Sequence, residues 1–411
     1  MRPEQRFLNY VKIWSTSQAG ADCVPSTECQ FALARQLVAE LKELGIADAE
    51  MDAHGYVYGH IPASSGYENA VRLGFIAHMD TSPDCPARNV QPQMIENYDG
   101  GDVVLGESGQ VIRTADFPHL KQMQGRTLIC TDGTTLLGAD DKAGIAEILT
   151  MAERVLQEGI PHGPISIAFT PDEEIAHGAA LLDLEKFNAQ FAYTMDGDLE
   201  NELNYETFNA VAATFTCHGF MVHPGYAKDI MVNSQLIAVE LAGMFPPAET
   251  PANTEGYQGY YHLFSMEGSV ALTKLSYLVR DHDAARMQQR IEFMHSIVRF
   301  LNQKYGEDTV QLSYKVTCRN MAEALQEYMF LLEDAKTAMR RVGLEPVIVP
   351  VRGGTDGARL SFRGLPCLNI GVGAGARHSL CEHISVESLE LDTQVAIELV
   401  KIFAEKRNSD K

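Results

Sequence analysis

Three short apolar segments, each followed by acidic residues, most strongly constrain how this chain of 411 residues can fold. Apolar runs this short, bounded by polar residues, are typical of buried strands. Between them, apolar residues recur at helical spacing, as in ADDKAGIAEILTMAERVLQEG (139–159). Strands that alternate with helices predict an α/β fold with a mainly parallel central sheet flanked by helices. The three segments are VRLGFIAHMD (71–80), ISIAFTPDEE (165–174) and FAYTMDG (191–197).

The pattern changes between residues 207 and 318. VAATFTCHG (211–219) and VALTKLSYLVRDHD (270–283) alternate in the manner of half-exposed strands, and helices are expected near 232–244 and 284–305. Residues 245–262, rich in Pro, Gly and Tyr, are expected to form a long ordered loop. The sequence therefore predicts an α+β domain at 207–318, inserted into a domain formed by 1–206 and 319–411.

Three further helices are expected in the outer domain. Pro25-Ser26 is a capping signal ahead of an amphipathic segment that ends at Gly45. The other two helices are expected at 322–342, and near 386–406 at the end of the chain.

Charge and cysteine usage exclude several classes of protein. Lys plus Arg number 33 and Asp plus Glu 55, which gives a formal charge of −22. The negative electrostatic field of such a charge repels nucleic acids and anionic membranes. The eight cysteines form no C-x-x-C pair, and a chain this long can bury a core without disulfides. No apolar run approaches the ~18 residues of a membrane span, and the first residues lack the apolar region of a signal peptide. We therefore expect a cytoplasmic protein with free thiols.

Acidic residues and histidines gather where the predicted strands end. In such sheets ligands bind beyond the carboxyl ends of the strands. Each group also has an ordinary reading: a hydrogen-bonded His-x-Asp pair, a solvated acidic loop, or a helix cap at Asp140-Asp141. So many carboxylates at one edge would repel one another unless cations lay among them. Zinc accepts histidine nitrogen and carboxylate oxygen, and two zinc ions need a bridging carboxylate. The set fits five ligands: His78, Asp140, Glu174, Asp196 and His378.

Two neighbours of these ligands have expected roles of their own. Asp80 lies two residues from His78, whose ring needs an acceptor for its second N–H. Glu173, beside a ligand, can instead face the attacking water and move its proton. Pro171 supplies the irregular backbone that two adjacent Glu residues with separate roles require.

Read together, several motifs resemble the dizinc metallopeptidase family of carboxypeptidases and aminoacylases, and within it the bacterial tripeptide aminopeptidases. The motifs are GFIAHMDTSPD, TLLGADDKAGIAEI, AFTPDEE, YTMDG, VHPG and RGGTDGARLS. The resemblance covers nearly the whole chain. It implies two Zn²⁺ per subunit, or other divalent ions, with Asp140 as the bridge. It also implies Asp80 as the residue that orients His78, and Glu173 as general base and acid.

The same resemblance implies the substrate site and the partners. His223, in VHPG, would stabilise the oxyanion, often from the partner subunit of a homodimer formed through the inserted lid. Arg280 would hold the terminal carboxylate of a small peptide, with Asn233 and Arg352 as weaker candidates. His223 could also be a simple turn residue, and Arg280 a surface ion pair with Asp281. The remaining histidines are expected to be structural.

The implied activity is a zinc-dependent aminopeptidase that releases the N-terminal residue of tripeptides, with Glu173 as the base for the metal-bridging water. The same centre would also serve a dipeptidase, carboxypeptidase or N-acyl amino acid deacylase, and a catalytically silent metal-binding protein is a further alternative. Four segments depart from the family pattern. GDLE (197–200) stands where a glycine-rich stretch is expected, and GVGAGAR (371–377) lacks the expected aromatic residues. HSLCEHI (378–384) replaces a more basic loop, and HGF (218–220) differs just ahead of VHPG. These departures leave peptide length and side-chain preference open.

Overall fold

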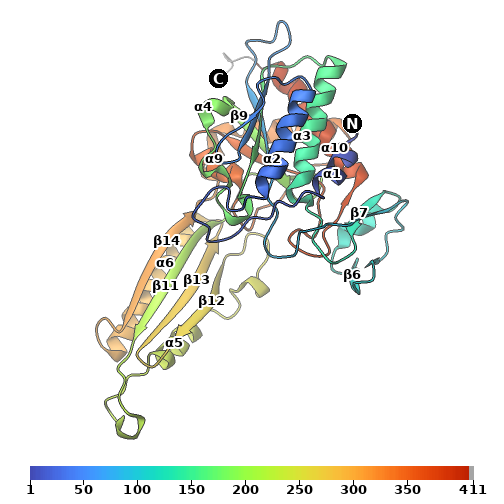
Figure 1. Ribbon diagram of the computed structural model, residues 1–411. Helices are drawn as coiled ribbons and strands as arrows, with labels where there is room; N and C mark the ends of the chain where they lie inside the picture. Colours follow the sequence, from blue (N-terminus) through green and yellow to red (C-terminus); the bar gives the residue numbers. More distant parts are fainter. Residues whose placement is uncertain (407–411) are drawn as a thin grey trace. The chain divides into compact units, whose positions relative to one another are not determined.

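The computed structural model describes residues 1–406, which form two compact units (Figure 1). Among the described residues, unit 1 comprises Met1–Tyr205, Ala324–Val349 and residues 355–406, and unit 2 comprises Glu206–Glu323 and Pro350–Gly354. The insert predicted at 207–318 lies within unit 2. Within residues 1–406, every helix is too short or too polar to cross a membrane.

An eight-stranded sheet forms the centre of unit 1, in the order β1-β2-β8-β3-β9-β16-β10-β15. Its four middle strands run parallel to one another, whereas β2 and β10 pair antiparallel with their inner neighbours. The predicted α/β class with a mainly parallel sheet is thus confirmed. The strands are β1 (Glu50–Met51), β2 (Val57–Ile61), β3 (Leu73–His78), β8 (Ile165–Thr170), β9 (Phe191–Gly197), β10 (Glu202–Asn204), β15 (Val347–Ile348) and β16 (Cys367–Gly371).

Helices cover both faces of this sheet. Adjacent residues of β3 point to opposite faces, so each face presents apolar side chains of this strand to a different set of helices. Phe75 meets the ring of Tyr193, which in turn contacts Phe403 of α10. Ile76 instead joins a buried cluster with Leu360 of α9. The helix α3 packs against β3, β9, α1 and α10. The helices of unit 1 are α1 (Pro3–Tyr10), α2 (Gln30–Glu43), α3 (Ala139–Glu158), α4 (Leu184–Phe187), α8 (Phe330–Arg341), α9 (Asp356–Phe362) and α10 (Val386–Ala404). The short helix α7 (Ala322–Leu325) begins in unit 2 and ends in unit 1.

A small second sheet in unit 1 has no counterpart in the sequence prediction. It consists of β17 (Ile384–Ser385), β7 (Leu128–Thr131) and β4 (Pro92–Ile95), in that order. Beside it, β5 (Val103–Leu105) and β6 (Gln110–Ile112) form a two-stranded sheet, and both sheets share an apolar cluster that includes Leu105 of β5 and Leu128 of β7. The pairing of Ile384 with Ile129 holds the segment that follows His378.

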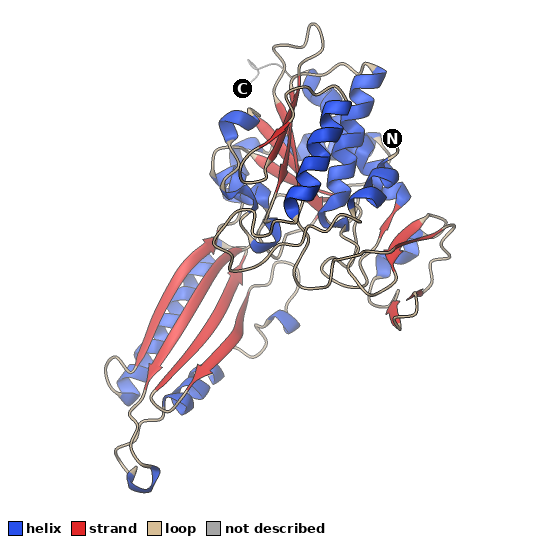
Figure 2. Cartoon of the chain, viewed as in Figure 1, coloured by secondary structure: helices blue, strands red, loops and turns tan. Residues whose placement is uncertain are grey.

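Unit 2 is an antiparallel sheet with two helices on one face (Figure 2). The strands are ordered β12 (Tyr260–Gly268), β13 (Leu272–Asp281), β11 (Asn209–His218) and β14 (Val310–Cys318). Buried residues alternate along β11 and β13, and α5 (Ser234–Gly243) and α6 (Ala284–Tyr305) pack against these strands. The expected loop at 245–262 ends earlier than predicted, because β12 begins at Tyr260.

Two other local predictions were wrong. The helix expected at 322–342 is broken into α7, a 3-10 turn at Gln326–Tyr328 and α8, although no Gly or Pro marks the break. Ser26 does not cap α2, which begins at Gln30. The backbone N–H and the hydroxyl of Ser26 donate instead to the carboxylate of Asp172, at 2.7 and 2.5 Å. A tertiary partner has therefore displaced the local capping bond.

Candidate metal centre

The candidate ligands lie at one edge of the central sheet of unit 1. His78 is the last residue of β3, Glu174 follows β8, and Asp196 lies near the end of β9. His378 is in the loop after β16, and Asp140 is in the first turn of α3. Because β8, β3, β9 and β16 are adjacent and parallel, their carboxyl ends present these side chains together.

The five predicted ligands form two groups that share Asp140. His78 Nε2 lies 2.9 Å from Asp140 Oδ1 and 3.5 Å from Asp196 Oδ1. His378 Nε2 lies 2.8 Å from Glu174 Oε2 and 3.2 Å from Asp140 Oδ2. One oxygen of Asp140 therefore faces each group, which is the arrangement that a bridging carboxylate needs.

The backbone around α3 distinguishes Asp140 from its neighbour Asp141. Both residues have non-helical torsion angles at the start of the helix. The carboxylate of Asp141 accepts the backbone N–H of His78 at 3.1 Å and that of Gly144 at 3.2 Å. Asp141 therefore fastens α3 to β3, and Asp140 is the residue whose oxygens face both histidines.

Asp80 connects two of the strand ends. The Nδ1 of His78 lies 3.0 Å from the carbonyl oxygen of Asp80, which can only accept, so Nδ1 donates and Nε2 is turned towards Asp140. The Asp80 carboxylate is 3.5 Å from Nδ1. It accepts the backbone N–H groups of Glu173 at 2.9 Å and Glu174 at 3.2 Å. Asp80 thus positions the ring of His78 and the acidic turn after β8.

The electrostatics of the cluster fit a bound cation. Bonds to Asp140 and Glu174 raise the pKa of His378 to about 11. Burial and the carboxylate of Asp140 raise the pKa of Glu174 to about 7. Glu174 Oε1 is buried and has no hydrogen-bond partner among residues 1–406. Donor atoms of His78, Asp140 and Glu174 lie within 4.8 Å of one another, as do those of His78, Asp141 and Asp196. Carboxylate oxygens and imidazole nitrogens are donors that zinc accepts, so both groups offer suitable ligands.

Glu173, the predicted base, is half-buried beside the ligands. The backbone N–H of Glu173 donates to the carboxylate of Asp80, and this bond fixes the position from which the Glu173 side chain extends. Burial and the carboxylate of Asp196 raise the pKa of Glu173 well above its usual range. A carboxyl group with a raised pKa is suited to taking up and returning a proton near neutral pH.

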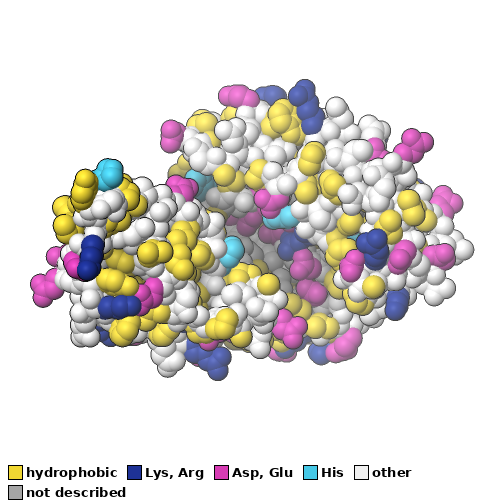
Figure 3. Space-filling view, turned by 90° about the horizontal axis from the view of Figure 1, so that it is seen from below, with side chains coloured by type: hydrophobic (Ala, Val, Ile, Leu, Met, Phe, Trp, Pro, Cys, Tyr) yellow, Lys and Arg dark blue, Asp and Glu magenta, His cyan; other side chains and the backbone are white. Residues whose placement is uncertain are grey.

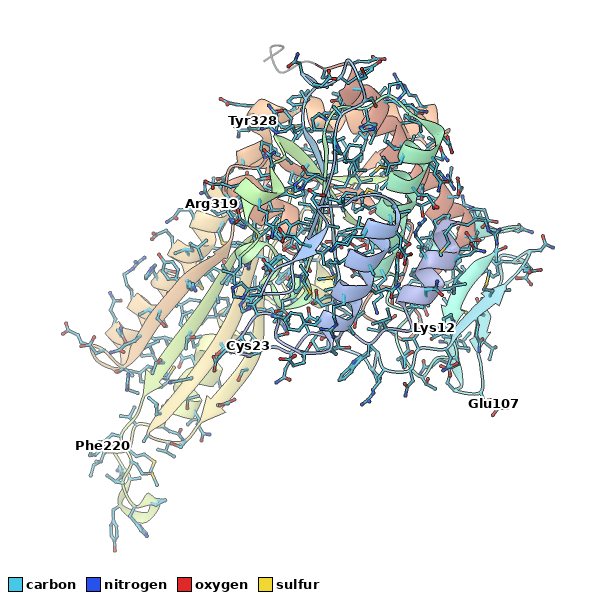
Figure 4. All side chains as sticks on the ribbon, turned by 45° about the horizontal axis from the view of Figure 1, so that its top comes forward. Lys12, Cys23, Glu107, Phe220, Arg319 and Tyr328 are labelled. Carbon is cyan, nitrogen blue, oxygen red and sulfur yellow. The ribbon has the colours of Figure 1, made fainter. Side chains whose placement is uncertain are left out.

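The four predicted substrate residues all belong to unit 2. His223 lies in the segment 219–233 beyond the end of β11, the segment in which Figure 4 labels Phe220, and its Nδ1 accepts the N–H of Gly225 at 3.1 Å. Arg280, on β13, has a buried Nε without a hydrogen-bond partner in residues 1–406. Asn233 caps α5 through the N–H of Gln235. Their contact with substrate stays a prediction.

Arg352, also in unit 2, already uses its donors within that unit. Nη1 donates to the carbonyl oxygens of Gly256 and Gln258 at 2.7 and 2.9 Å, and Nη2 donates to Thr254 Oγ1 at 2.9 Å. These bonds hold the loop before β12, so a role for Arg352 in binding substrate also stays a prediction.

Two residues near the ligands were not predicted to have a role. Glu382 is buried and its carboxylate accepts the backbone N–H groups of Leu137, Gly138 and Asp140. Arg377 Nη1 lies 3.4 Å from Asp140 Oδ2 and 3.3 Å from Asp196 Oδ1. Arg377 ends the segment 371–377 that is expected to depart from the family pattern, whereas the sequence signal for Glu382 was its place in the H-x-x-x-E-x-I pattern that begins at His378.

Comparisons with known proteins identify the family of this chain. The family model of peptidase family M20/M25/M40 matches residues 136–402. The chain is 49% identical to a peptidase T of Halothermothrix orenii over 403 residues, 98% of each chain. It is 48% identical to a peptidase T of Caldanaerobacter subterraneus over 404 residues, again 98% of each. Among solved structures, a tripeptidase of Staphylococcus aureus matches with a TM-score of 0.77 at 22% identity, covering 98% of both chains. The chain thus belongs to peptidase family M20/M25/M40.

Proposed function

We propose that this protein is a metal-dependent aminopeptidase that releases the N-terminal residue of tripeptides. The observation that carries the proposal is the pair of histidine–carboxylate groups that share Asp140, with Glu173 beside them. Relatives named peptidase T, similar over 98% of their length, support the same activity.

In the proposed reaction, His78, Asp140, Glu174, Asp196 and His378 would hold two zinc ions or other divalent ions. When bound, these ions would polarise the scissile carbonyl and make the attacking water more acidic. Glu173 would take the proton from that water and return it to the leaving amine. Asp80 would keep His78 and the acidic turn in place throughout.

Unit 2 is proposed to complete the site and to form a homodimer. We assign His223 to the oxyanion, from the partner subunit, and Arg280 to the terminal carboxylate of the peptide. The support is a set of exposed apolar side chains on unit 2, where Figure 3 shows hydrophobic groups at the surface. A mass in solution equal to one chain would remove the dimer and the role of His223 in trans. The exposed residues are Phe220, Met221, Tyr226, Ile230, Leu236, Val239 and Phe264.

The test of the substrate class uses a free tripeptide, its N-acetylated form and the matching dipeptide, with products identified by mass. Loss of only the first residue, from the free tripeptide alone, is the expected result. Cleavage of the acetylated peptide or of the dipeptide would instead indicate a deacylase, carboxypeptidase or dipeptidase of the same family.

We further propose a cytoplasmic location. All eight cysteines are free thiols, and three of them are fully buried, which suits a reducing compartment. Cell fractionation with an antibody against the protein tests this location, and recovery from an extracytoplasmic fraction would contradict it.

A further inference from the structure

The acidic turn after β8 has a backbone that needs support from outside. It carries Glu173 and Glu174 in the short 3-10 helix Glu173–Ile175. The residues that flank this helix, Asp172 and Ala176, have φ angles of 58° and 61°. Residues other than glycine seldom adopt this left-handed conformation, and they keep it only where surrounding contacts impose it. Bonds from other elements must therefore hold the turn.

Asp356 supplies such bonds at both ends of the turn. It lies in RGGTDGARLS, a motif in which only Arg352 has an expected role, and it is the first residue of α9. Asp356 Oδ2 accepts the hydroxyl of Thr170 at 2.8 Å, and Oδ1 accepts the backbone N–H of Ala179 at 2.6 Å. Thr170 is the last residue of β8, and Ala179 lies beyond the turn. One carboxylate thus joins the two ends of the segment 170–179.

The carboxylate of Asp356 is tightly enclosed. Asp356 is 4% exposed, and both of its partners, Thr170 and Ala179, are fully buried. A Cβ on Gly178 would lie 2.4 Å from each carboxylate oxygen, so the carboxylate lies directly against the backbone of the turn. Because water is excluded there, it does not compete for the two hydrogen bonds.

Asp80 and Asp356 hold the turn in different ways. Asp80 accepts the adjacent N–H groups of Glu173 and Glu174, which fixes the middle of the turn at one place. Bonds at one place leave the turn free to tilt about it, whereas the bonds of Asp356 fix both ends. Glu174 would also be held by the ion that it binds. Glu173 is not a proposed ligand, so the turn decides where its carboxylate points.

We propose that Asp356 is a positioning residue for Glu173: by joining Thr170 to Ala179, it sets the tilt of the turn and so the place from which the base acts. This inference rests on the proposed function and deepens it, because it names a residue outside the ligand set on which the base depends. A misplacement of about 1 Å can slow an enzyme by about 10²-fold. Loss of both bonds should therefore lower kcat by about 10²-fold, with little change in KM or in bound metal.

Substitutions in the full chain separate the two bonds from the charge of Asp356. Asp356→Ala removes both bonds and should show the full loss of kcat. Asp356→Asn keeps both, because its amide oxygen can accept from Ala179 and its NH₂ group can donate to the Thr170 hydroxyl. It should therefore retain most of the activity. Thr170→Val removes one bond and should lose less kcat than Asp356→Ala. In the double variant, Thr170→Val should add no loss to that of Asp356→Ala.

Hydrogen exchange of the metal-free proteins reports on the turn independently of activity. The amides of residues 172–179 should exchange faster in Asp356→Ala than in wild type, and at the wild-type rate in Asp356→Asn. Titration with Co²⁺ alone, followed by visible absorption, should give the same binding in wild type and in each variant.

Thr393→Val is the matched control for Thr170→Val. Thr393 is also fully buried, and its hydroxyl donates to the carbonyl oxygen of Leu389, within α10, at 2.8 Å. The control variant loses a similar bond in another element. Its kcat and the exchange of its residues 172–179 should match those of wild type.

Each outcome decides the proposal. Wild-type kcat in Asp356→Ala would overturn it. Equal losses in Asp356→Asn and Asp356→Ala would overturn it too, because the charge and not the two bonds would then matter. Loss of Co²⁺ binding in step with kcat would also count against it, since Asp356 would then act on the ligands rather than on Glu173.

Two further results are also decisive. If Asp356→Ala does not fold, Thr170→Val should still have a lower kcat than Asp356→Asn, and the reverse order would refute the role of Asp356. If wild type leaves tripeptides intact, the proposed function fails. The exchange rates of residues 172–179 would then still decide whether Asp356 holds the turn.

Discussion

Replacement of Glu382 by Gln tests how the loop before α3 holds Asp140. The Glu382 side chain is buried, with 1% exposure. Oε2 accepts the N–H groups of Leu137 and Gly138, both at 2.7 Å, and Oε1 accepts that of Asp140 at 3.0 Å. One carboxylate therefore fixes the residues that lead into the candidate bridging ligand.

The size of the effect follows from these three bonds. In Glu382→Gln the amide oxygen can replace Oε2, but its NH₂ group then faces the N–H of Asp140. One bond to a charged acceptor is lost and a buried N–H is left unpaired. Together these changes should lower the free energy of unfolding by about 3 kcal/mol. Displacement of Asp140 should also weaken metal binding by about 10–100-fold.

Denaturant unfolding of the metal-free variants measures the first effect, and metal titration the second. Glu387→Gln is the control, because Glu387, in the first turn of α10, accepts a single backbone N–H among residues 1–406, that of Thr127, at 3.2 and 3.0 Å. It should lose less than about 1 kcal/mol. Equal stability and metal affinity in the two variants would refute the role of Glu382.

Three further substitutions test other parts of unit 1. Burial lowers the pKa of His383 from 6.5 to about 4, so the folded state binds fewer protons and wild type loses stability as the pH falls from 6.5 to 4. In His383→Phe, the free energy of unfolding should fall by up to about 3 kcal/mol less than in wild type between pH 6.5 and pH 4. The same pH dependence in both proteins would contradict this prediction. Burial raises the pKa of Asp392 well above 3.8, so its ionisation destabilises the fold as the pH rises. Asp392→Asn should be more stable than wild type at pH 7 by about 1 kcal/mol in urea unfolding, and lower stability would refute this reasoning. Gly144→Ala would place a Cβ 2.1 Å from the carbonyl oxygen of Met195. A thermal scan should therefore show that the free energy of unfolding falls by about 3 kcal/mol. An unchanged stability would show that α3 can shift to admit the Cβ.

Features carried by local sequence could be predicted. The buried strands β3, β8 and β9 follow from apolar runs that end in acids, and α3 follows from its helical spacing. The candidate ligands follow because parallel strands place their carboxyl ends at one edge. Residues such as His78 and Asp196 could therefore be grouped before their distances were known.

Features that depend on distant partners could not be predicted. The small sheet of β4, β7 and β17 consists of strands of two to four residues, too short for a periodic signal. Ser26 looks like a helix cap until Asp172 approaches it from the turn after β8. The pairing of Arg377 with Asp198 likewise arises only when β9 and β16 become neighbours.

The most direct test of the account compares wild type with Glu173→Gln, measuring zinc per chain and tripeptide hydrolysis on the same samples. The proposed roles predict two zinc ions per chain in both proteins, because Glu173 is not a ligand. They predict a fall in hydrolysis of about 10²–10⁴-fold in the variant. Near-normal hydrolysis by Glu173→Gln, or fewer than two ions in fully loaded wild type, would contradict the dinuclear mechanism.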